Sequence, residues 1–256
     1  MLKGKTVVVT GGSSGIGKAI ALRFAREGAS VAVVASKDLT KADVVVRDIQ
    51  ATGGAARGYV VDVRDNAAVR ELLAKVKEDQ GPVDVLVTSA GVFVPNPLGD
   101  ESVALFNQMI DINVKGTFHC VNAVVPQMKA SGGGTIICLS SAADRLGIGS
   151  FSAYCASKAA VSMMAQTLAL ELAQHRININ AISPGNTATP MNEGMRNDPA
   201  QAGLMNALKA ATPSTRIFSD PEDVAELALF LTSPAGRAMH GSSIVMDEGL
   251  SAGVML

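Results

Sequence analysis

Short runs of β-branched and other apolar residues alternate along the chain with longer segments of helical character. The short runs are apolar at successive positions, which is typical of strands covered on both faces of a parallel sheet. These runs are Thr6–Thr10, Val31–Val34, Gly58–Val61, Val83–Val87, Thr135–Leu139, Ile177–Ile182 and Ser243–Met246. Helices are expected near 15–27, 39–51, 66–79, 101–130, 152–174 and 221–232. The alternation predicts an α/β fold with a doubly wound parallel sheet of about seven strands and helices on both faces.

No linker, repeat or low-complexity tract divides the 256 residues, so we expect a single domain, 1–256. The segment from Asn186 to Thr215 has no strand pattern and is rich in Pro, Asn and Met. A connection of this length inside a compact domain usually has a function, and we interpret it as a substrate-loop insertion at about 186–215. Its apolar side chains either close over a substrate or form the packing face of two short helices. They are Met191, Met195, Leu204, Met205 and Leu208.

The composition is 48% hydrophobic and 18% charged, with a formal net charge of -1. No cluster of Lys and Arg is present, so we expect neither a nucleic acid nor a membrane surface as partner. The apolar run Thr6–Thr10 is too short for a secretory signal or a membrane span. Cys120, Cys138 and Cys155 occur singly, without the spacing of a metal site. We expect a cytoplasmic protein that binds no metal.

A glycine-rich stretch, Thr10-Gly11-Gly12-Ser13-Ser14-Gly15-Ile16-Gly17, directly follows the first expected strand. Glycine lets the backbone turn sharply and approach a ligand closely, and the N-terminus of the next helix presents unpaired N–H groups to a pyrophosphate. The position between a strand and a helix therefore predicts a dinucleotide site. Its expected contacts are Gly11, Ser13, Ser14, Gly15, Ile16 and Gly17.

This spacing, T-G-x-x-x-G-x-G, together with the later Tyr154-Cys155-Ala156-Ser157-Lys158, resembles the short-chain dehydrogenase/reductase family. The resemblance extends over almost the whole chain and implies a Rossmann-like fold and an oxidoreductase that uses NAD or NADP. Further matches follow in the family's order at Asp62, Val63, Ala90, Gly91, Asn113 and Ser141. The resemblance also implies cofactor contacts at Ser89, Pro184, Gly185, Thr187 and Thr189, and from Tyr154 and Lys158 themselves.

The end of the second expected strand, Ala35-Ser36-Lys37-Asp38, bears on the choice of cofactor. An acidic residue there binds the adenosine 2′-OH of NAD and repels the phosphate of NADP, and Ala35 occupies the family's position for it. Ser36 and Lys37 suit a 2′-phosphate, although Ser14 stands where many NADP-type relatives carry a basic residue. We interpret Asp38 as the N-cap of the following helix. NADP is therefore favoured, with NAD as the alternative.

Tyr154 and Lys158 are four residues apart and lie on one face of an expected helix. A free phenol has a pKa of about 10, and a nearby ammonium group together with the positive ring of an oxidised nicotinamide lowers it. The resemblance assigns proton exchange to Tyr154. It implies that Lys158 lowers the pKa of Tyr154 and holds the hydroxyls of the nicotinamide ribose. It assigns hydrogen bonding to the substrate oxygen to Ser141, and support of a proton relay to Asn113. The other residues of the motif are expected to serve packing: Cys155, Ala156 and Ser157.

We expect an enzyme that interconverts a secondary alcohol and a ketone of small size by hydride transfer, with Tyr154 as general acid and base. One alternative is a 3-oxoacyl-thioester reductase acting on an acyl-carrier protein. A non-catalytic NAD(P)-sensing regulator is the third, and the loss of Tyr154, Lys158 or Ser141 that would favour it is not observed. Asp144 and Arg145, close after Ser141, either line the pocket entrance or form a surface ion pair.

The segments near 101–130 and 152–174 are apolar on more than one face and must be buried on more than one face. In the resembling family, the two corresponding helices pair with their mates in a dimer, and C-terminal segments often complete a tetramer. The apolar tail Gly249–Leu256 is consistent with that second contact. We therefore expect a homotetramer.

Overall fold

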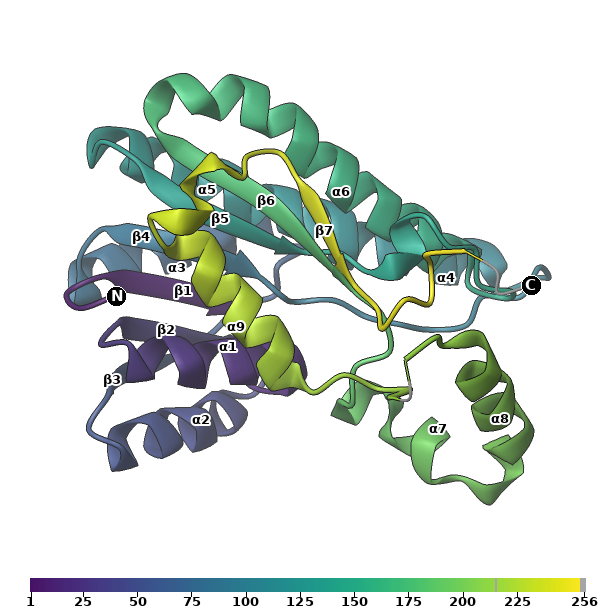
Figure 1. Ribbon diagram of the computed structural model, residues 1–256. Helices are drawn as coiled ribbons and strands as arrows, with labels where there is room; N and C mark the ends of the chain where they lie inside the picture. The colour runs from purple at the N-terminus through teal and green to yellow at the C-terminus, as the bar shows by residue number, and fades with distance from the viewer. Residues whose placement is uncertain (215, 254–256) are drawn as a thin grey trace.

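The computed structural model describes residues 1–214 and 216–253 of the chain. Its strands form one parallel seven-stranded sheet in the order β3-β2-β1-β4-β5-β6-β7 (Figure 1). They are β1 (Thr6–Thr10), β2 (Ser30–Ala35), β3 (Ala55–Val60), β4 (Val83–Thr88), β5 (Gly134–Leu139), β6 (Ile177–Pro184) and β7 (Ser243–Met246). The strand order reverses between β1 and β4, which confirms the predicted Rossmann-like doubly wound sheet.

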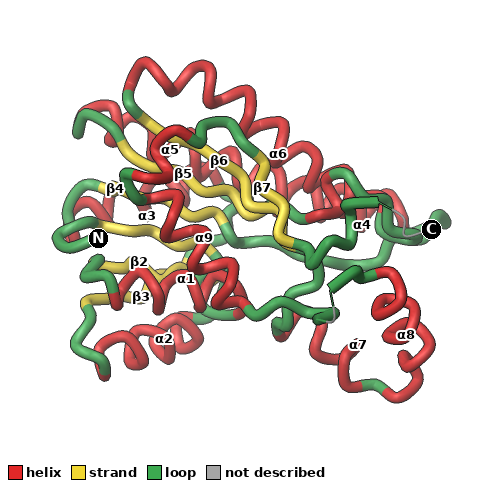
Figure 2. Tube along the Cα trace, in the orientation of Figure 1, coloured by secondary structure: helices red, strands yellow, loops and turns green. Residues whose placement is uncertain are grey.

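Helices cover both faces of this sheet (Figure 2). One face carries α1 (Gly15–Arg26), α2 (Leu39–Ala51) and α9 (Pro221–Thr232). The opposite face carries α3 (Asn66–Gln80), α5 (Gly116–Ala130) and α6 (Ser152–Leu172), and α4 (Ser102–Met109) contacts α6. Successive strand residues point to opposite faces, so in β1 Val7 and Val9 pack under the first group and Val8 under the second. The apolar runs of the sequence are explained by this burial on both sides.

Several helices begin at side chains that satisfy their first N–H groups. Asp65 accepts hydrogen bonds from the N–H groups of Ala67 and Ala68 at the start of α3. Asp220 forms a capping box with Asp223, and Pro221 occupies the first position of α9. In contrast, the side chain of Ser14 makes no capping hydrogen bond at the start of α1. The N-terminus of α1 therefore keeps N–H groups for another acceptor.

The single helix expected over 101–130 is interrupted. A π-helical segment, Ile110–Lys115, separates α4 from α5. A π-helical turn contains an extra residue and is common at functional positions, and here it contains the buried Asn113. Periodicity did not predict this interruption, because the segment has the same apolar character as the α-helices beside it.

The segment that follows β6 forms a lobe beyond the carboxyl edge of the sheet (Figure 1). It contains α7 (Glu193–Asn197) and α8 (Ala202–Ala211), and neither helix has a buried residue. Short 3-10 turns, Pro190–Asn192 and Pro199–Gln201, precede these helices, and others lie at Ala142–Asp144, Ala173–His175 and Ala235–Ala238. The predicted end of the insertion, Thr215, lies outside the described residues. Across the described ranges, no helix combines the length and the apolar character needed to cross a membrane.

Candidate active site

A cleft of about 560 Å³ opens at the carboxyl edge of the sheet, beside the point where the strand order reverses. Most of the residues expected to bind a cofactor line it: Gly11, Ser13, Ser14, Gly15, Ile16, Ser36, Lys37, Asp62, Val63, Ser89, Ala90, Gly91, Tyr154, Lys158 and Thr189. Four expected contacts do not lie on its wall: Gly17, Pro184, Gly185 and Thr187. Gly17 supports the turn from behind, as the next paragraph describes. The N–H of Gly185 donates to the Met246 carbonyl at 2.8 Å, which pairs this turn with the end of β7.

The glycine turn is packed so closely that side chains are excluded. Gly11 has a φ of +66°, and a Cβ atom there would lie 2.8 Å from the Ala90 nitrogen. A Cβ atom on Gly17 would lie 2.4 Å from the carbonyl oxygen of Gly11. Together with the N–H groups at the start of α1, this bare backbone fits a pyrophosphate, which needs close approach and hydrogen-bond donors without side chains between. The residues present therefore fit a dinucleotide cofactor.

Polar and charged side chains surround the far end of the cleft, beyond the tips of β2 and β3. Ser36, Lys37 and Arg64 line it. The predicted N-cap role of Asp38 is confirmed, because its carboxylate accepts hydrogen bonds from the N–H and the hydroxyl of Thr40 at 2.9 and 2.6 Å.

Arg64 is a member of the cleft that the sequence analysis missed. Its guanidinium donates to both carboxylate oxygens of Asp62, with Nε at 3.0 Å from each. Hydrogen bonds from Arg64 lower the pKa of Asp62, and the charge of Lys37 acts in the same direction. The only sequence signal was its position directly after Asp62-Val63, which places its backbone at the tip of a strand that ends at the cleft.

Tyr154 and Lys158 occupy one face of α6, as their spacing predicted. The Lys158 Nζ lies 5.6 Å from the centroid of the Tyr154 ring and donates a hydrogen bond to the Leu139 carbonyl at 2.9 Å. Burial lowers the pKa of Lys158 to about 8. The distance to the ring and the bond to Leu139 place the amine beside the Tyr154 ring, at the end of β5.

The pKa of Tyr154 is raised, whereas the sequence analysis predicted that a nearby ammonium group and an oxidised nicotinamide ring together lower it. Burial raises the pKa of Tyr154 to about 12, and hydrogen bonding with the Ser141 hydroxyl acts in the opposite direction. The physical reason is that removing a phenolate from water costs more here than its neighbours return. The Ser141 Oγ also accepts a hydrogen bond from the Ala143 N–H at 3.2 Å, at the start of the 3-10 turn that follows β5.

Asn113 reaches the same region from the π-helical segment. Its side chain accepts a hydrogen bond from the Val92 N–H at 2.9 Å and donates to the Val92 carbonyl at 3.0 Å. It also donates to the Ser157 Oγ at 3.0 Å, and that hydroxyl donates to the Tyr154 carbonyl at 2.7 Å. Ser157 is completely buried, so its assignment to packing was incomplete: it hydrogen-bonds the asparagine to the tyrosine helix.

Gly91 is the point where these groups converge. A Cβ atom there would lie 3.3 Å from the Asn113 Oδ1 and 3.7 Å from the Lys158 Nζ. Three chain segments distant in sequence therefore meet beside the cleft: the turn after β4, the π-helical segment and α6.

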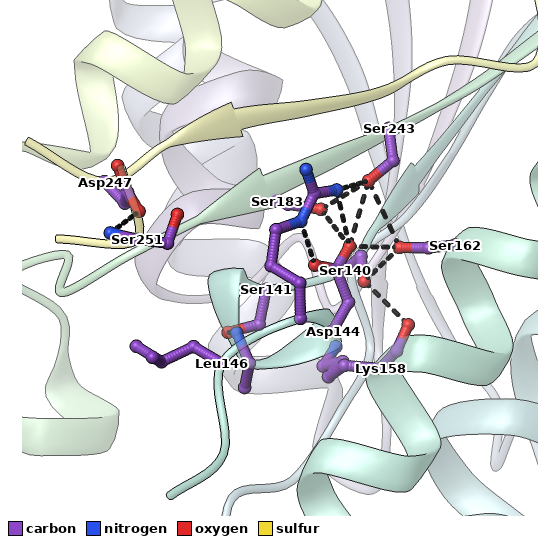
Figure 3. A network of polar contacts seen from close by, with 12 residues as sticks. Ser140, Ser141, Asp144, Leu146, Lys158, Ser162, Ser183, Ser243, Asp247 and Ser251 are labelled. Carbon is purple, nitrogen blue, oxygen red and sulfur yellow. Dashed lines mark hydrogen bonds and ion pairs between the residues drawn. The ribbon is translucent and has the colours of Figure 1, made fainter. Parts of the chain in front are cut away.

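Asp144 differs from both alternatives considered for it. The ion pair with Arg145 is present, with Nε at 2.8 Å from Oδ1, but only 2% of the Asp144 side chain is exposed. The hydroxyls of Ser162, Ser183 and Ser243 donate to its Oδ2 at 2.5, 2.7 and 2.9 Å (Figure 3). The carboxylate is neither a pocket-lining group nor a surface pair, because it joins α6, β6 and β7 behind the reaction region.

These contacts also set the charge state of Asp144. Burial acts to raise its pKa, but hydrogen bonds from Arg145 and the three serines outweigh that effect, so the pKa is lowered. The network extends further, since the Ser162 Oγ lies 2.8 Å from the Ser140 Oγ and Ser140 donates to the Lys158 carbonyl at 2.8 Å (Figure 3). Sequence spacing did not predict it, because its members come from four separate segments.

The fold and the cleft define a dinucleotide-binding α/β protein with a Tyr, Lys, Ser and Asn group at its sheet edge. A family model described as enoyl-(acyl carrier protein) reductase matches residues 11–251. The 3beta-hydroxysteroid dehydrogenase 1 of Eggerthella lenta is 38% identical over 251 residues, covering 98% of this chain and 95% of that relative. The chain belongs to the short-chain dehydrogenase/reductase family and is an NAD(P)-dependent oxidoreductase.

Solved structures agree with this assignment. A gluconate 5-dehydrogenase from Burkholderia cenocepacia J2315 in complex with NADP and tartrate has a TM-score of 0.92 and 29% identity, covering 99% of this chain and 97% of that chain. A 7 alpha-hydroxysteroid dehydrogenase complexed with NADH and 7-oxo glycochenodeoxycholic acid has a TM-score of 0.91 and 33% identity, covering 97% and 94%. The chain is therefore similar along nearly its whole length to dehydrogenases with different substrates.

Proposed function

We propose that this protein interconverts a secondary alcohol and a ketone, with Tyr154 exchanging the proton on the substrate oxygen. The observation that carries the proposal is the convergence of Asn113 and Lys158 at Gly91, on the wall of the cleft that fits a dinucleotide. Tyr154 lines the same cleft, and the Ser141 hydroxyl acts to lower the pKa of its phenol. Four polar groups from distant segments thus surround one small volume beside the cofactor cradle.

Each side chain has a distinct part in the proposed reaction. Tyr154, neutral at pH 7 because its pKa is about 12, donates its proton to the oxygen of a ketone and recovers it in the reverse direction. Ser141 donates a hydrogen bond to that oxygen and stabilises the charge that develops on it. When bound, the nicotinamide supplies or accepts the hydride at the carbinol carbon. Lys158 holds the nicotinamide ribose, and Asn113 keeps the turn at Val92 in place beneath it.

The adenosine end favours NADP over NAD. Ser36 and Lys37 face the cleft without an acidic residue at the end of β2, where Ala35 stands. Asp38 is engaged in capping α2, and Arg64 neutralises Asp62. Of the charged residues that line this end of the cleft, Lys37 and Arg64 are positive and Asp62 is negative, so a 2′-phosphate would meet an excess of positive charge. The structure of the gluconate 5-dehydrogenase contains NADP and that of the steroid dehydrogenase contains NADH, so the relatives alone do not decide this point.

Reduction of an acyl thioester on a carrier protein is the second candidate, because the matching family model bears that kind of description. An acidic carrier protein needs a basic docking surface beside the site. The loop 92–98 and the segment 146–151, both of which precede Tyr154 in the chain, contain no charged residue. This favours a small free substrate. A purely regulatory role would not require the assembled Tyr, Lys, Ser and Asn group.

We further propose a homotetramer of single-domain subunits in the cytoplasm. Large apolar side chains are uncovered on the helices expected to pair: Phe106, Phe118, Met163 and Leu170, with Leu170 82% exposed. The expected second contact is the tail Gly249–Leu256, of which residues 254–256 lie outside the described residues. The lobe from Asn186 onward is proposed as the substrate lid, since Met191 lines the cleft at its base.

The test is a screen of absorbance near 340 nm with both nicotinamide cofactors against paired alcohols and ketones. Turnover with at least one pair is expected, together with loss of more than about a hundredfold in kcat for Tyr154→Phe, as expected for general acid catalysis. NADPH binding by Tyr154→Phe, followed by fluorescence, serves as the control for folding. Wild-type turnover by Tyr154→Phe on a confirmed substrate would refute the assignment.

A further inference from the structure

Two phenylalanines form an aromatic wall beside the phenol of Tyr154. The rings of Phe93 and Phe151 are stacked, with centroids 4.3 Å apart and planes 6° apart. Phe93 also meets the Tyr154 ring edge to face, at 4.7 Å and 77°. Phe93 follows β4 in the turn after Gly91, and Phe151 directly precedes α6. Neither residue belongs to the motifs by which the sequence was interpreted.

The backbone on both sides of this wall is held by buried amides. Asn113 hydrogen-bonds both the N–H and the carbonyl of Val92, the residue before Phe93. Asn96 is 2% exposed, and its side chain bonds both residues that follow Phe151. It donates to the Ser152 Oγ at 3.0 Å and accepts from the Ala153 N–H at 3.1 Å. The two rings are therefore placed by hydrogen-bonded backbone and do not depend on mobile side-chain contacts.

The chain segments that carry the rings are uncharged. Residues 92–98 read VFVPNPL and residues 146–151 read LGIGSF. The nearest charged residue in sequence, Arg145, is bound to Asp144 and Ser243. A carboxylate or phosphate on the substrate would find no ionic partner on these segments, whereas an apolar ring would find the aromatic surface of the stacked pair.

We propose that Phe93 and Phe151 determine specificity for neutral, ring-shaped alcohols and ketones, packing against the ring while its oxygen meets Tyr154. This inference rests on the proposed function. It predicts discrimination against open-chain and anionic substrates, since an open chain loses more conformational freedom on binding and an anion loses its hydration without a compensating partner.

The kinetic test compares tetralone and cyclohexanone with open-chain hexanone and with a keto acid, using the full chain and the better cofactor. We expect kcat/KM for the ring ketones to exceed that for hexanone by about tenfold or more. Phe93→Leu and Phe151→Leu should each reduce this ratio by about three- to tenfold, the range for one aromatic contact, mainly through KM. Phe230→Leu, the same change on α9 across the sheet, should leave the ratio unchanged.

A binding measurement separates this inference from the proposed chemistry. Ligand-observed NMR on Tyr154→Phe with saturating NADPH should show tetralone binding that Phe93→Leu weakens in the same background, even if no substrate in the panel is turned over. Absence of turnover with ring binding intact would count against the proposed function alone. Equal or better use of hexanone or the keto acid, or an unchanged preference in both Leu variants, would overturn the specificity role.

Discussion

Asn113 holds the main chain of Val92 from both sides, accepting from its N–H at 2.9 Å and donating to its carbonyl at 3.0 Å. The π-helical segment brings this side chain, 1% exposed, to the turn after β4. The same amide reaches Ser157 on α6. One side chain therefore joins the cofactor-facing turn to the helix that carries Tyr154 and Lys158.

Replacing Asn113 with Ala should lower both activity and stability. It leaves the Val92 N–H and carbonyl without their partner, and a buried unpaired group costs about 1–3 kcal/mol. We expect urea unfolding to report a loss of about 2–4 kcal/mol, and kcat to fall more than about tenfold because the turn is displaced. Ser157→Ala, which removes one end of this connection, should lose only about 1 kcal/mol. Equal losses of unfolding free energy in the two variants would contradict a role of Asn113 in holding the Val92 backbone.

Asp144 should be far more important for stability than its position in a loop suggests. Asp144→Ala leaves the hydroxyls of Ser162, Ser183 and Ser243 without their common acceptor, and Ser183 is completely buried. We expect a loss of about 3–5 kcal/mol in urea unfolding. Arg145→Ala removes a half-exposed partner and should lose about 1 kcal/mol or less. Asp144→Asn keeps one acceptor oxygen and should fall between them. A loss below about 1 kcal/mol for Asp144→Ala would show that the network does not stabilise the fold.

The buried amine of Lys158 gives the cofactor-free protein a distinctive pH dependence of stability. Its pKa is about 8 in the folded protein against an ordinary value of 10.5, so between these values the unfolded chain binds more protons. The contribution of Lys158 to the free energy of unfolding should therefore rise with pH from about 8 toward 10, by at most about 1.4 kcal/mol per pH unit. Burial raises the pKa of the Cys120 and Cys138 thiols from 9.0 to about 12 and about 11, so these groups oppose the rise above about pH 9. Tyr154, with a pKa raised from 10.0 to about 12, adds to this opposition above about pH 10.

Urea unfolding of wild type and Lys158→Met at several pH values checks this expectation. The Met variant lacks the titrating amine, so its stability should rise less with pH than that of wild type over the same interval. Parallel pH profiles in the two proteins would show that Lys158 is not the source of the effect.

The glycine turn offers a matched pair of substitutions. A methyl group on Gly17 would lie 2.4 Å from the Gly11 oxygen, so Gly17→Ala must displace the turn and should weaken NADPH binding by about tenfold or more. Gly203→Ala in α8 meets no atom within 4 Å and should leave NADPH binding unchanged while stabilising the helix by about 0.5–1 kcal/mol. Fluorescence titration of NADPH measures the first effect and thermal unfolding the second. Unaltered NADPH affinity in Gly17→Ala would show that the close packing of Gly17 against the Gly11 carbonyl is not needed for cofactor binding.

Lys37 should distinguish NADP from NAD. Lys37→Ala removes a positive charge from the adenosine end and is expected to raise the dissociation constant of NADPH by about three- to tenfold, as for an exposed charge pair, with NADH binding unchanged. Lys41→Ala, a nearby exposed lysine on α2 that does not line the cleft, is the control. An equal effect on both cofactors would indicate that Lys37 does not contact the phosphate.

The sequence by itself determined the order of strands and helices, the glycine turn and the Tyr154 and Lys158 pair. These features are local: apolar runs reflect burial on both faces of a sheet, and residues four apart share a helix face. It also indicated Asp38 as a cap, since capping depends on neighbouring N–H groups alone.

Only the tertiary structure decided the features that join distant segments. The π-helical interruption at Asn113, the Ser157 connection, the Asp144 network and the stack of Phe93 on Phe151 each join residues from separate elements. The charge states depend on tertiary structure for the same reason. The sequence predicted that the Lys158 ammonium group and an oxidised nicotinamide ring lower the pKa of Tyr154. Burial, which only the packed fold produces, instead raises this pKa to about 12.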